Sequence, residues 1–262
     1  MVGLAVAIGA FVTSDASAAQ WVKLGYGSQH FGNGGEFAFT ASTTGTPAEK
    51  NASLQFVKDT AANYGPNSKI GSLAAGTIGF ETFCIEYNEH FSPGTNYQYQ
   101  VNPLGAIKGG QAISDSISVG TAFLYGLFAK GTLPGYNYTD VNAFSAGNLQ
   151  NTIWFLESEQ VSLPNGNFIN NPGTFTALLT AEFGSNPVVW RGDSATSVSY
   201  GIVNAASFGV AAMNLGGGPT WPNQDQLIYQ GGGFQKIPDG GATLILLGMT
   251  MTGLTFLRRK LS

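Results

Sequence analysis

Residues 80–87 read FETFCIEY, and this stretch carries the clearest strand signal in the chain. It is rich in aromatic and β-branched residues, a composition typical of a β-strand. The strand would hold Cys84, the one cysteine of the chain. Residues 97–101 (YQYQV) alternate between apolar and polar types, and we expect them to pair near this strand.

Further strands and helices follow from the periodicity of the apolar residues. We expect strands at 21–27, 36–41, 52–57, 188–190, 198–203, 208–215 and 226–230. Helical spacing predicts helices at 117–129, 139–159 and 174–183, the first capped by Asp115 or Ser116 and the second by Thr139 or Asp140. The sequence therefore predicts an α+β fold: a β-rich domain with about three inserted helices, whose second half forms a sandwich.

The composition excludes some classes of protein. Charged residues make up 10% of the 262 residues, the formal net charge is −4, and 37 residues are glycine. Because the body of the chain has no basic run, nucleic acid is not an expected partner. Apolar residues reach 43%, which is enough for a folded core.

The N-terminal residues resemble a secretory signal peptide. An apolar stretch at residues 2–12 (VGLAVAIGAFV) is followed by Ala16, Ser17 and Ala18, an A-x-A-type cleavage site. We therefore expect residues 1–19 to be a leader and residues 20–230 to be an extracellular body. Residues 231–236, rich in glycine, would link this body to the C-terminus.

The C-terminal residues 237–262 have the order of a sorting tail. Pro238, Asp239, Gly240 and Gly241 would break any helix between the body and an apolar block at residues 243–257. We expect a membrane helix at about 241–257, held on its cytoplasmic side by the basic residues Arg258, Arg259 and Lys260.

This tail resembles the PEP-CTERM sorting signals, in the variant that reads V-P-D-[SG]-G, with Ile237 in place of the usual valine. The resemblance implies processing by an exosortase-type membrane protease. It places the protein at the cell surface, in the outer envelope or in an exopolysaccharide matrix, after transient anchoring in the inner membrane. A plain C-terminal membrane anchor is the alternative.

Two segments together suggest a reaction. Cys84 lies in the strand at 80–87, and residues 148–154 (NLQNTIW) lie in the predicted helix at 139–159. Attack of a thiolate on a glutamine side-chain amide expels ammonia and leaves an internal thioester, which needs an unpaired cysteine and shelter from water. Gln150 is the expected acyl partner of Cys84.

These segments resemble the Cys–Gln thioester-forming domains of bacterial surface adhesins, which carry an aromatic-Cys motif and a later T-Q-x-A-[IV]-W motif. The resemblance implies a thioester between Cys84 and Gln150, and weaker similarity extends to residues 224–227. Leu149 and Thr152 depart from the motif. The surroundings of the thioester would comprise Phe83, Glu86, Ile153 and Trp154.

The expected function is therefore non-enzymatic covalent attachment, without a cofactor or a metal, to an amine or hydroxyl on a surface protein or an exopolysaccharide. A structural exopolysaccharide-associated protein with a merely buried Cys84 is the alternative. A secreted hydrolase that pairs Cys84 with His90 lacks an orienting partner. Glu86 and Glu157 are expected to be ordinary exposed carboxylates, with polarisation of the amide or of a nucleophile as the alternative role. Arg191-Gly192-Asp193 is either a receptor motif or a turn.

Overall fold

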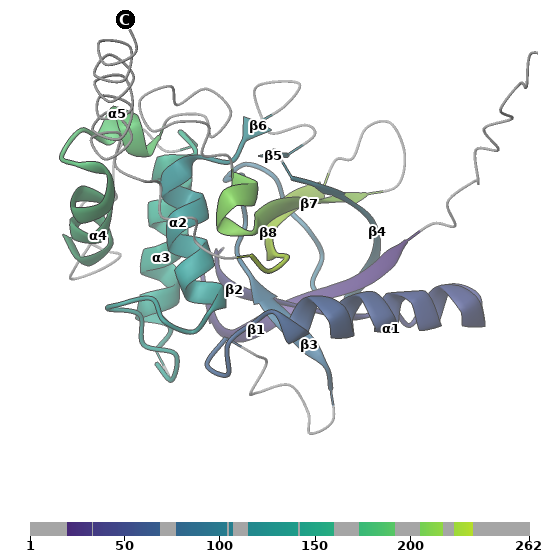
Figure 1. Cartoon of the computed structure of the whole chain (residues 1–262). Helices are drawn as coiled ribbons and strands as arrows, with labels where there is room; N and C mark the ends of the chain where they lie inside the picture. Colours follow the sequence, from purple (N-terminus) through teal and green to yellow (C-terminus); the bar gives the residue numbers. More distant parts are fainter. Residues whose placement is uncertain are drawn as a thin grey trace, which may run out of the picture.

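The computed structural model describes residues 20–32, 34–68, 77–103, 105–106, 115–140, 142–159, 173–191, 205–216 and 223–232. Its centre is a six-stranded antiparallel sheet in the order β3-β2-β1-β4-β7-β8 (Figure 1). The strands are β1 (Trp21–Phe31), β2 (Gly34–Ala41), β3 (Gly79–Thr82), β4 (Thr95–Asn102), β7 (Val210–Gly216) and β8 (Asn223–Tyr229). A small second sheet pairs β5 (Gly105–Ala106) with β6 (Asp115–Ser116).

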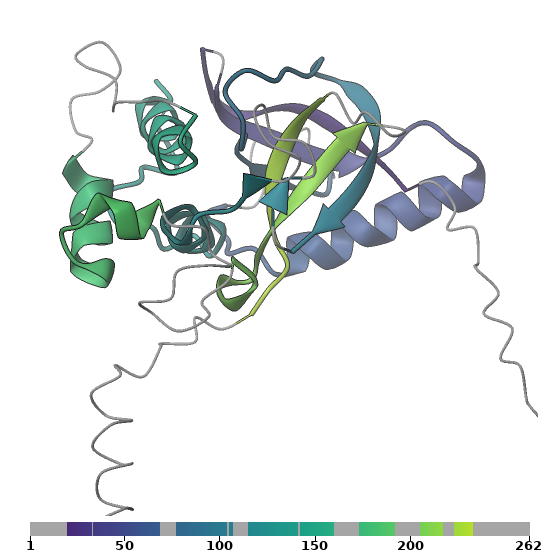
Figure 2. The same ribbon diagram turned by 90° about the horizontal axis from the view of Figure 1, so that it is seen from above.

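The large sheet curls until its two edges meet, as the view from above shows (Figure 2). The segment that follows β3 pairs with β8. The main-chain N–H of Ile85 donates to the carbonyl of Asp225 at 3.0 Å, and that of Leu227 donates to the carbonyl of Phe83 at 2.9 Å. Closure of this kind removes exposed strand edges.

Five helices accompany the sheet in the part of the chain that the structure describes. They are α1 (Pro47–Ala62), α2 (Val119–Ala129), α3 (Phe144–Leu156), α4 (Gly173–Phe183) and α5 (Pro187–Trp190), with a 3₁₀ turn η2 (Ala205–Phe208) before β7. In Figure 1, α2 and α3 lie side by side next to the sheet, and α4 and α5 lie beyond them.

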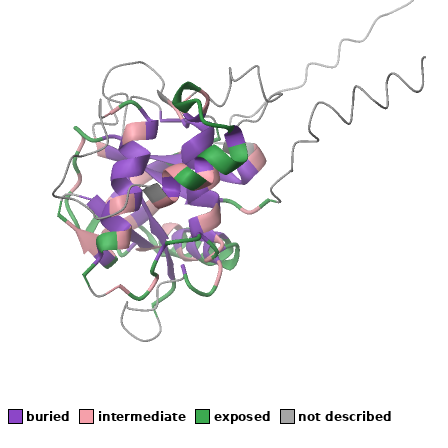
Figure 3. Cartoon of the chain, turned by 90° about the vertical axis from the view of Figure 1, so that its left-hand side faces the viewer, coloured by how far each residue is buried: buried purple, intermediate pink, exposed green. Residues whose placement is uncertain are grey.

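Buried residues fill the sheet and the helix faces that meet it (Figure 3). In β1 and β4 the burial alternates, so that Val22, Leu24, Tyr97 and Tyr99 face the core. Every residue of β7 is buried. The prediction of a fold that mixes helices with a β-sheet is therefore confirmed.

Two predicted strands are wrong, because local helix signals outweigh short runs of β-type residues. Residues 52–57 lie inside α1, which Thr46 starts with a reciprocal capping box to Glu49 and which has proline at its first position. Residues 188–190 lie in the short helix α5, where the Asn186 side chain accepts from the N–H of Val188.

Both predicted helix caps are also wrong. Ser118 caps α2, because its hydroxyl accepts from the N–H of Thr121. The helix predicted at 139–159 begins only at Phe144, after Ala143 in the left-handed region at φ 55°. The carboxylate of Asp140 reaches the helix from further out, accepting from the N–H of Ser145 at 3.2 Å.

The expected arrangement of the strands needs two corrections. Strands from both halves of the chain share one curled sheet, so the second half does not form a sandwich of its own. Strand β4 lies between β1 and β7 and is separated from β3 by two strands, β2 and β1, and so does not pair with it.

The leader at 1–19, the strand at 198–203 and the sorting tail at 237–262 lie outside the described residues. Within the described ranges, no helix combines the length and the apolar character needed to cross a bilayer.

Candidate functional site

Cys84 lies where the curled sheet closes. It forms an isolated antiparallel bridge with Gln226 of β8. The hydrogen bonds of the bridge run through the flanking residues, Phe83 to Leu227 and Ile85 to Asp225, so Cys84 and Gln226 are a non-hydrogen-bonded pair. In such a pair the two side chains leave the same face and come closer than at any other cross-strand position.

The side chains of this pair are in contact. The Nε2 atom of Gln226 donates to the Sγ atom of Cys84 at 3.3 Å, and both residues have 0% exposure. The Oε1 atom of Gln226 is buried without a hydrogen-bond partner among the described residues. An unpartnered buried amide oxygen costs about 1–3 kcal/mol, so this amide is held against the thiol in an unfavourable ground state.

Gln150 also reaches Cys84, but at the main chain. Its Oε1 atom accepts from the N–H of Cys84 at 3.0 Å, and its Nε2 atom donates to the carbonyl of Cys84 at 2.8 Å. The side-chain amide thereby makes the two bonds that a neighbouring strand would make. Gln150 is 1% exposed, so these bonds are shielded from water.

Gly34 of β2 leaves the room for this amide. A Cβ atom at this position would lie 2.6 Å from Cγ of Gln150 and 2.9 Å from Cη2 of Trp154. Both distances are shorter than van der Waals contact, so a side chain here would displace Gln150 or Trp154.

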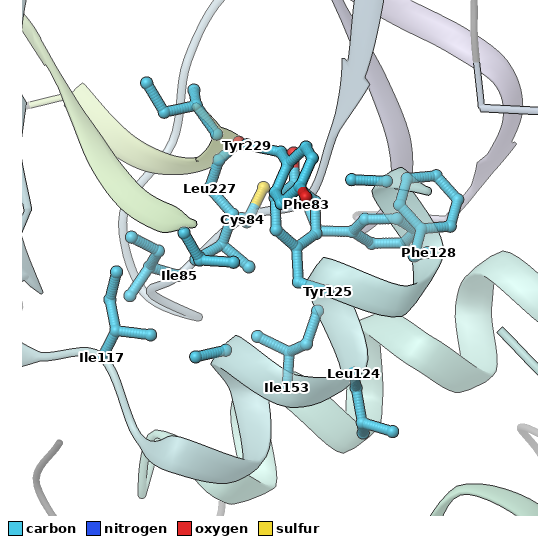
Figure 4. Packing of buried hydrophobic residues seen from close by; sticks show 14 of the residues in the cluster. Phe83, Cys84, Ile85, Ile117, Leu124, Tyr125, Phe128, Ile153, Leu227 and Tyr229 are labelled. Carbon is cyan, nitrogen blue, oxygen red and sulfur yellow. The ribbon is translucent and has the colours of Figure 1, made fainter. Parts of the chain in front are cut away.

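The remaining predicted site residues surround the pair. Trp154 donates from Nε1 to the carbonyl of Glu86 at 3.1 Å, and its ring meets that of Tyr87 edge-on at 4.9 Å between centroids. Ile153 is fully buried in the core, together with Phe83. Figure 4 labels Phe83 and Ile153 in the buried cluster that also contains Cys84.

Aromatic rings seal the site on the side of α2. Phe83 meets Phe128 edge-on at 4.9 Å and Tyr125 at 6.4 Å. Figure 4 labels Leu227 and Tyr229 of β8 among the buried residues of the cluster that includes Cys84. Cys84 itself has 0% exposure, so the thiol is shielded from water.

Burial determines the ionisation of the thiol. Desolvation raises the pKa of Cys84 well above its usual value; the N–H of Gln226 opposes this rise, and the carboxyl of Glu86 adds to it. In the folded protein the resting group is therefore a neutral thiol.

Two carboxyl groups expected to be exposed are buried instead. Glu86 has 0% exposure and Glu157 has 6%. Glu157 accepts from both the N–H and the hydroxyl of Ser118, at 3.1 Å and 2.8 Å from its Oε1 atom, and so it fixes the start of α2. It has a structural role.

A second buried carboxyl pair was not predicted. The hydroxyl of Ser28 bonds to both carboxyl groups, at 2.8 Å to Glu36 and 3.1 Å to Glu81, and Tyr136 donates to Glu36. Burial and then the charge of Glu36 raise the pKa of Glu81 to about 9. The irregularity of β1 between Tyr26 and His30, which places Ser28 here, has no signal in the sequence that we recognised.

The other predicted candidates are not assembled into a site. His90 is exposed, and among the described residues no hydrogen bond joins it to Cys84. Arg191 donates to the hydroxyl of Ser158 at 2.8 Å and lies over the ring of Phe155, while residues 192–194 lie outside the described residues. No group of His, Cys, Asp and Glu that could hold a metal ion occurs within the described ranges.

Comparison of the chain with known protein families, with curated proteins and with solved structures finds no match. The contacts around Cys84 are therefore the basis for assigning a function.

Proposed function

We propose that this chain is an exported surface protein that forms an internal thioester between Cys84 and Gln226, through which it attaches covalently to a partner. The single observation that supports this best is the contact of 3.3 Å between Sγ of Cys84 and Nε2 of Gln226 across the closing strand pair. The sulfur thus contacts the amide nitrogen that is bonded directly to Cδ, the carbon that it would attack.

The proposed formation step balances without an added reagent. The sulfur of Cys84 bonds to Cδ of Gln226, the C–N bond of the amide breaks, and the thiol proton leaves with the nitrogen as ammonia. The buried Oε1 atom, which has no partner as an amide oxygen, becomes the carbonyl oxygen of the thioester. A thioester oxygen is a weaker acceptor than an amide oxygen, so the reaction reduces the cost of burying it.

Gln150 has a different role in this proposal from the one that the sequence predicts. Both polar atoms of its amide are bonded to the main chain of Cys84, so attack on its carbon would break two buried hydrogen bonds. We propose that Gln150 holds the strand segment in place while Gln226 reacts. A thioester to Gln150 stays a prediction that the labelling experiment below also tests.

The attachment step uses the thioester once per molecule, so the protein is not an enzyme in this proposal. An amine or hydroxyl of the partner attacks Cδ of Gln226, an amide or ester forms, and Cys84 leaves as a thiol. The enclosure of Cys84 and Gln226 at 0% exposure keeps water from hydrolysing the thioester before the partner arrives. The sorting tail at 237–262 would deliver the protein to the cell surface or matrix, where such partners occur.

Labelling with methylamine tests the choice of glutamine. The native protein is incubated with methylamine, digested, and examined by tandem mass spectrometry for a methylamide. We expect the methylamide on Gln226, and none in Cys84→Ala. A methylamide on Gln150 would contradict our assignment but keep the thioester, whereas no label at either glutamine would contradict both.

A structural surface protein without this chemistry is the second candidate. The observation in its favour is that burial raises the pKa of Cys84. The buried thiol therefore stays neutral and unreactive toward outside reagents. An intact glutamine at both positions, with a thiol that alkylates on denaturation, would support it.

A further inference from the structure

The carboxyl group of Glu86 borders both residues of the proposed thioester. Glu86 follows Cys84 by two positions and has 0% exposure. Its Oε2 atom accepts from the N–H of Asp225, the residue before Gln226, at 3.1 Å. The single buried carboxyl group of Glu86 is thus fixed next to both strand segments that carry the reacting residues.

The other oxygen of this carboxyl group is uncommitted. Oε1 of Glu86 is buried and has no hydrogen-bond partner among the described residues. The main chain of Glu86 is held in place by two hydrogen bonds. Its carbonyl accepts from Nε1 of Trp154 at 3.1 Å and from Nε2 of Gln224 at 2.7 Å. A fixed carboxyl group with one free oxygen is the arrangement that proton transfer needs.

The charged neighbours of Glu86 are acidic. They are Asp225 on β8 and Glu89, three residues further along the chain. The charge of Glu159, which follows α3, raises the pKa of Glu89 in turn. Burial first, and then Asp225 and Glu89, raise the pKa of Glu86 well above its usual value. Because its pKa is raised, the carboxyl group of Glu86 is protonated more readily than an exposed glutamate, so it can hold a proton and return it.

Building on the proposed thioester, we infer that Glu86 is the proton-transfer group of the Cys84–Gln226 site. When an amine or hydroxyl attacks Cδ of Gln226, the new bond forms as the C–S bond breaks. The proton of the nucleophile passes to the carboxylate of Glu86 and from there to the sulfur, which leaves as the Cys84 thiol. Each proton is accounted for, and no oxidant or reductant is required.

The rate of methylamine capture against pH tests this role. Glu86→Gln keeps the size of the side chain and an oxygen for the N–H of Asp225, but cannot carry the proton. We expect it to capture methylamine at least about tenfold more slowly, because general base catalysis contributes 10²–10⁴-fold. The ratio of wild-type to variant rates should rise with pH and then level off, since the titration of the amine itself cancels in the ratio.

Glu89→Gln is the matched control, because burial and Glu159 raise the pKa of Glu89 to about 7 on the same loop. A ratio that is independent of pH for Glu86→Gln, or a pH-dependent ratio for Glu89→Gln instead, would overturn the inference. Should Glu86→Gln form no thioester, Glu86→Asp replaces it: a slower reaction with the wild-type pH dependence supports the role, and a lost pH dependence refutes it. A wild-type protein without thioester overturns both proposals.

Discussion

Replacing Gln150 by alanine separates its structural role from a chemical one. The change leaves the N–H and the carbonyl of Cys84 buried without the partners that now lie at 3.0 Å and 2.8 Å. Each such group costs about 1–3 kcal/mol, so we expect Gln150→Ala to lower the free energy of unfolding by about 2–6 kcal/mol. The thioester, however, should still form in the molecules that fold, because Gln226 keeps its contact with Cys84.

Urea denaturation measures the stability, and intact mass measures the thioester on the same sample. Gln55→Ala is the matched control, since Gln55 is exposed on α1 and its Nε2 atom donates to the carboxylate of Asp59 one turn along the helix. It should change the stability by less than about 0.5 kcal/mol. A Gln150→Ala protein as stable as this control, or a folded one that retains its ammonia, would refute the reasoning.

Three further changes test neighbouring contacts. Gly34→Ala should lower the stability by about 1–3 kcal/mol in urea, because its Cβ atom would meet Gln150 at 2.6 Å; no loss would show that the site is loosely packed. The pKa of Glu81 is raised to about 9 in the folded protein, so the folded state favours its protonated form. The contribution of Glu81 to the free energy of unfolding is therefore complete below its ordinary pKa and is lost as the pH rises toward about 9. The free energy of unfolding falls by at most about 1.4 kcal/mol per pH unit over this range. Denaturation from about pH 5 to about pH 9, which spans the ordinary and the raised pKa, should show this fall in the wild type and a flatter profile in Glu81→Gln. Equal slopes would contradict the raised pKa of Glu81. Ser118→Ala should cost about 1–2 kcal/mol by removing the cap of α2, and an unchanged melting temperature would contradict that role.

The sequence predicted the fold best where one physical signal acted alone. The alternation of 97–101 and the helical spacing of 117–129 correspond to β4 and α2, because burial on one face fixes the period. The strands predicted at 52–57 and 188–190 were wrong because a helix starts just upstream of each. Thr46 and Pro47 start the first helix, and Asn186 and Pro187 start the second. In both segments the helix start upstream outweighs the β propensity of a run of six residues or fewer.

The site could be predicted only in part. The sequence pointed to Cys84 and to the helix that carries Gln150, and the structure places that glutamine on the main chain of Cys84. Gln226 stood in a predicted strand, but its position opposite Cys84 depends on closure of the sheet between residues 142 positions apart. Cross-strand register over such a separation is set by the whole sheet and has no local signature.

The intact mass of the native protein tests the central claim most directly. We expect a mass lower by one ammonia than the sum of its residues, with Cys84→Ala and Gln226→Ala each at full mass and no alkylation of Cys84 in the native protein. A full mass for the freshly prepared native protein, together with a thiol that alkylates once the chain is denatured, would contradict the thioester between Cys84 and Gln226.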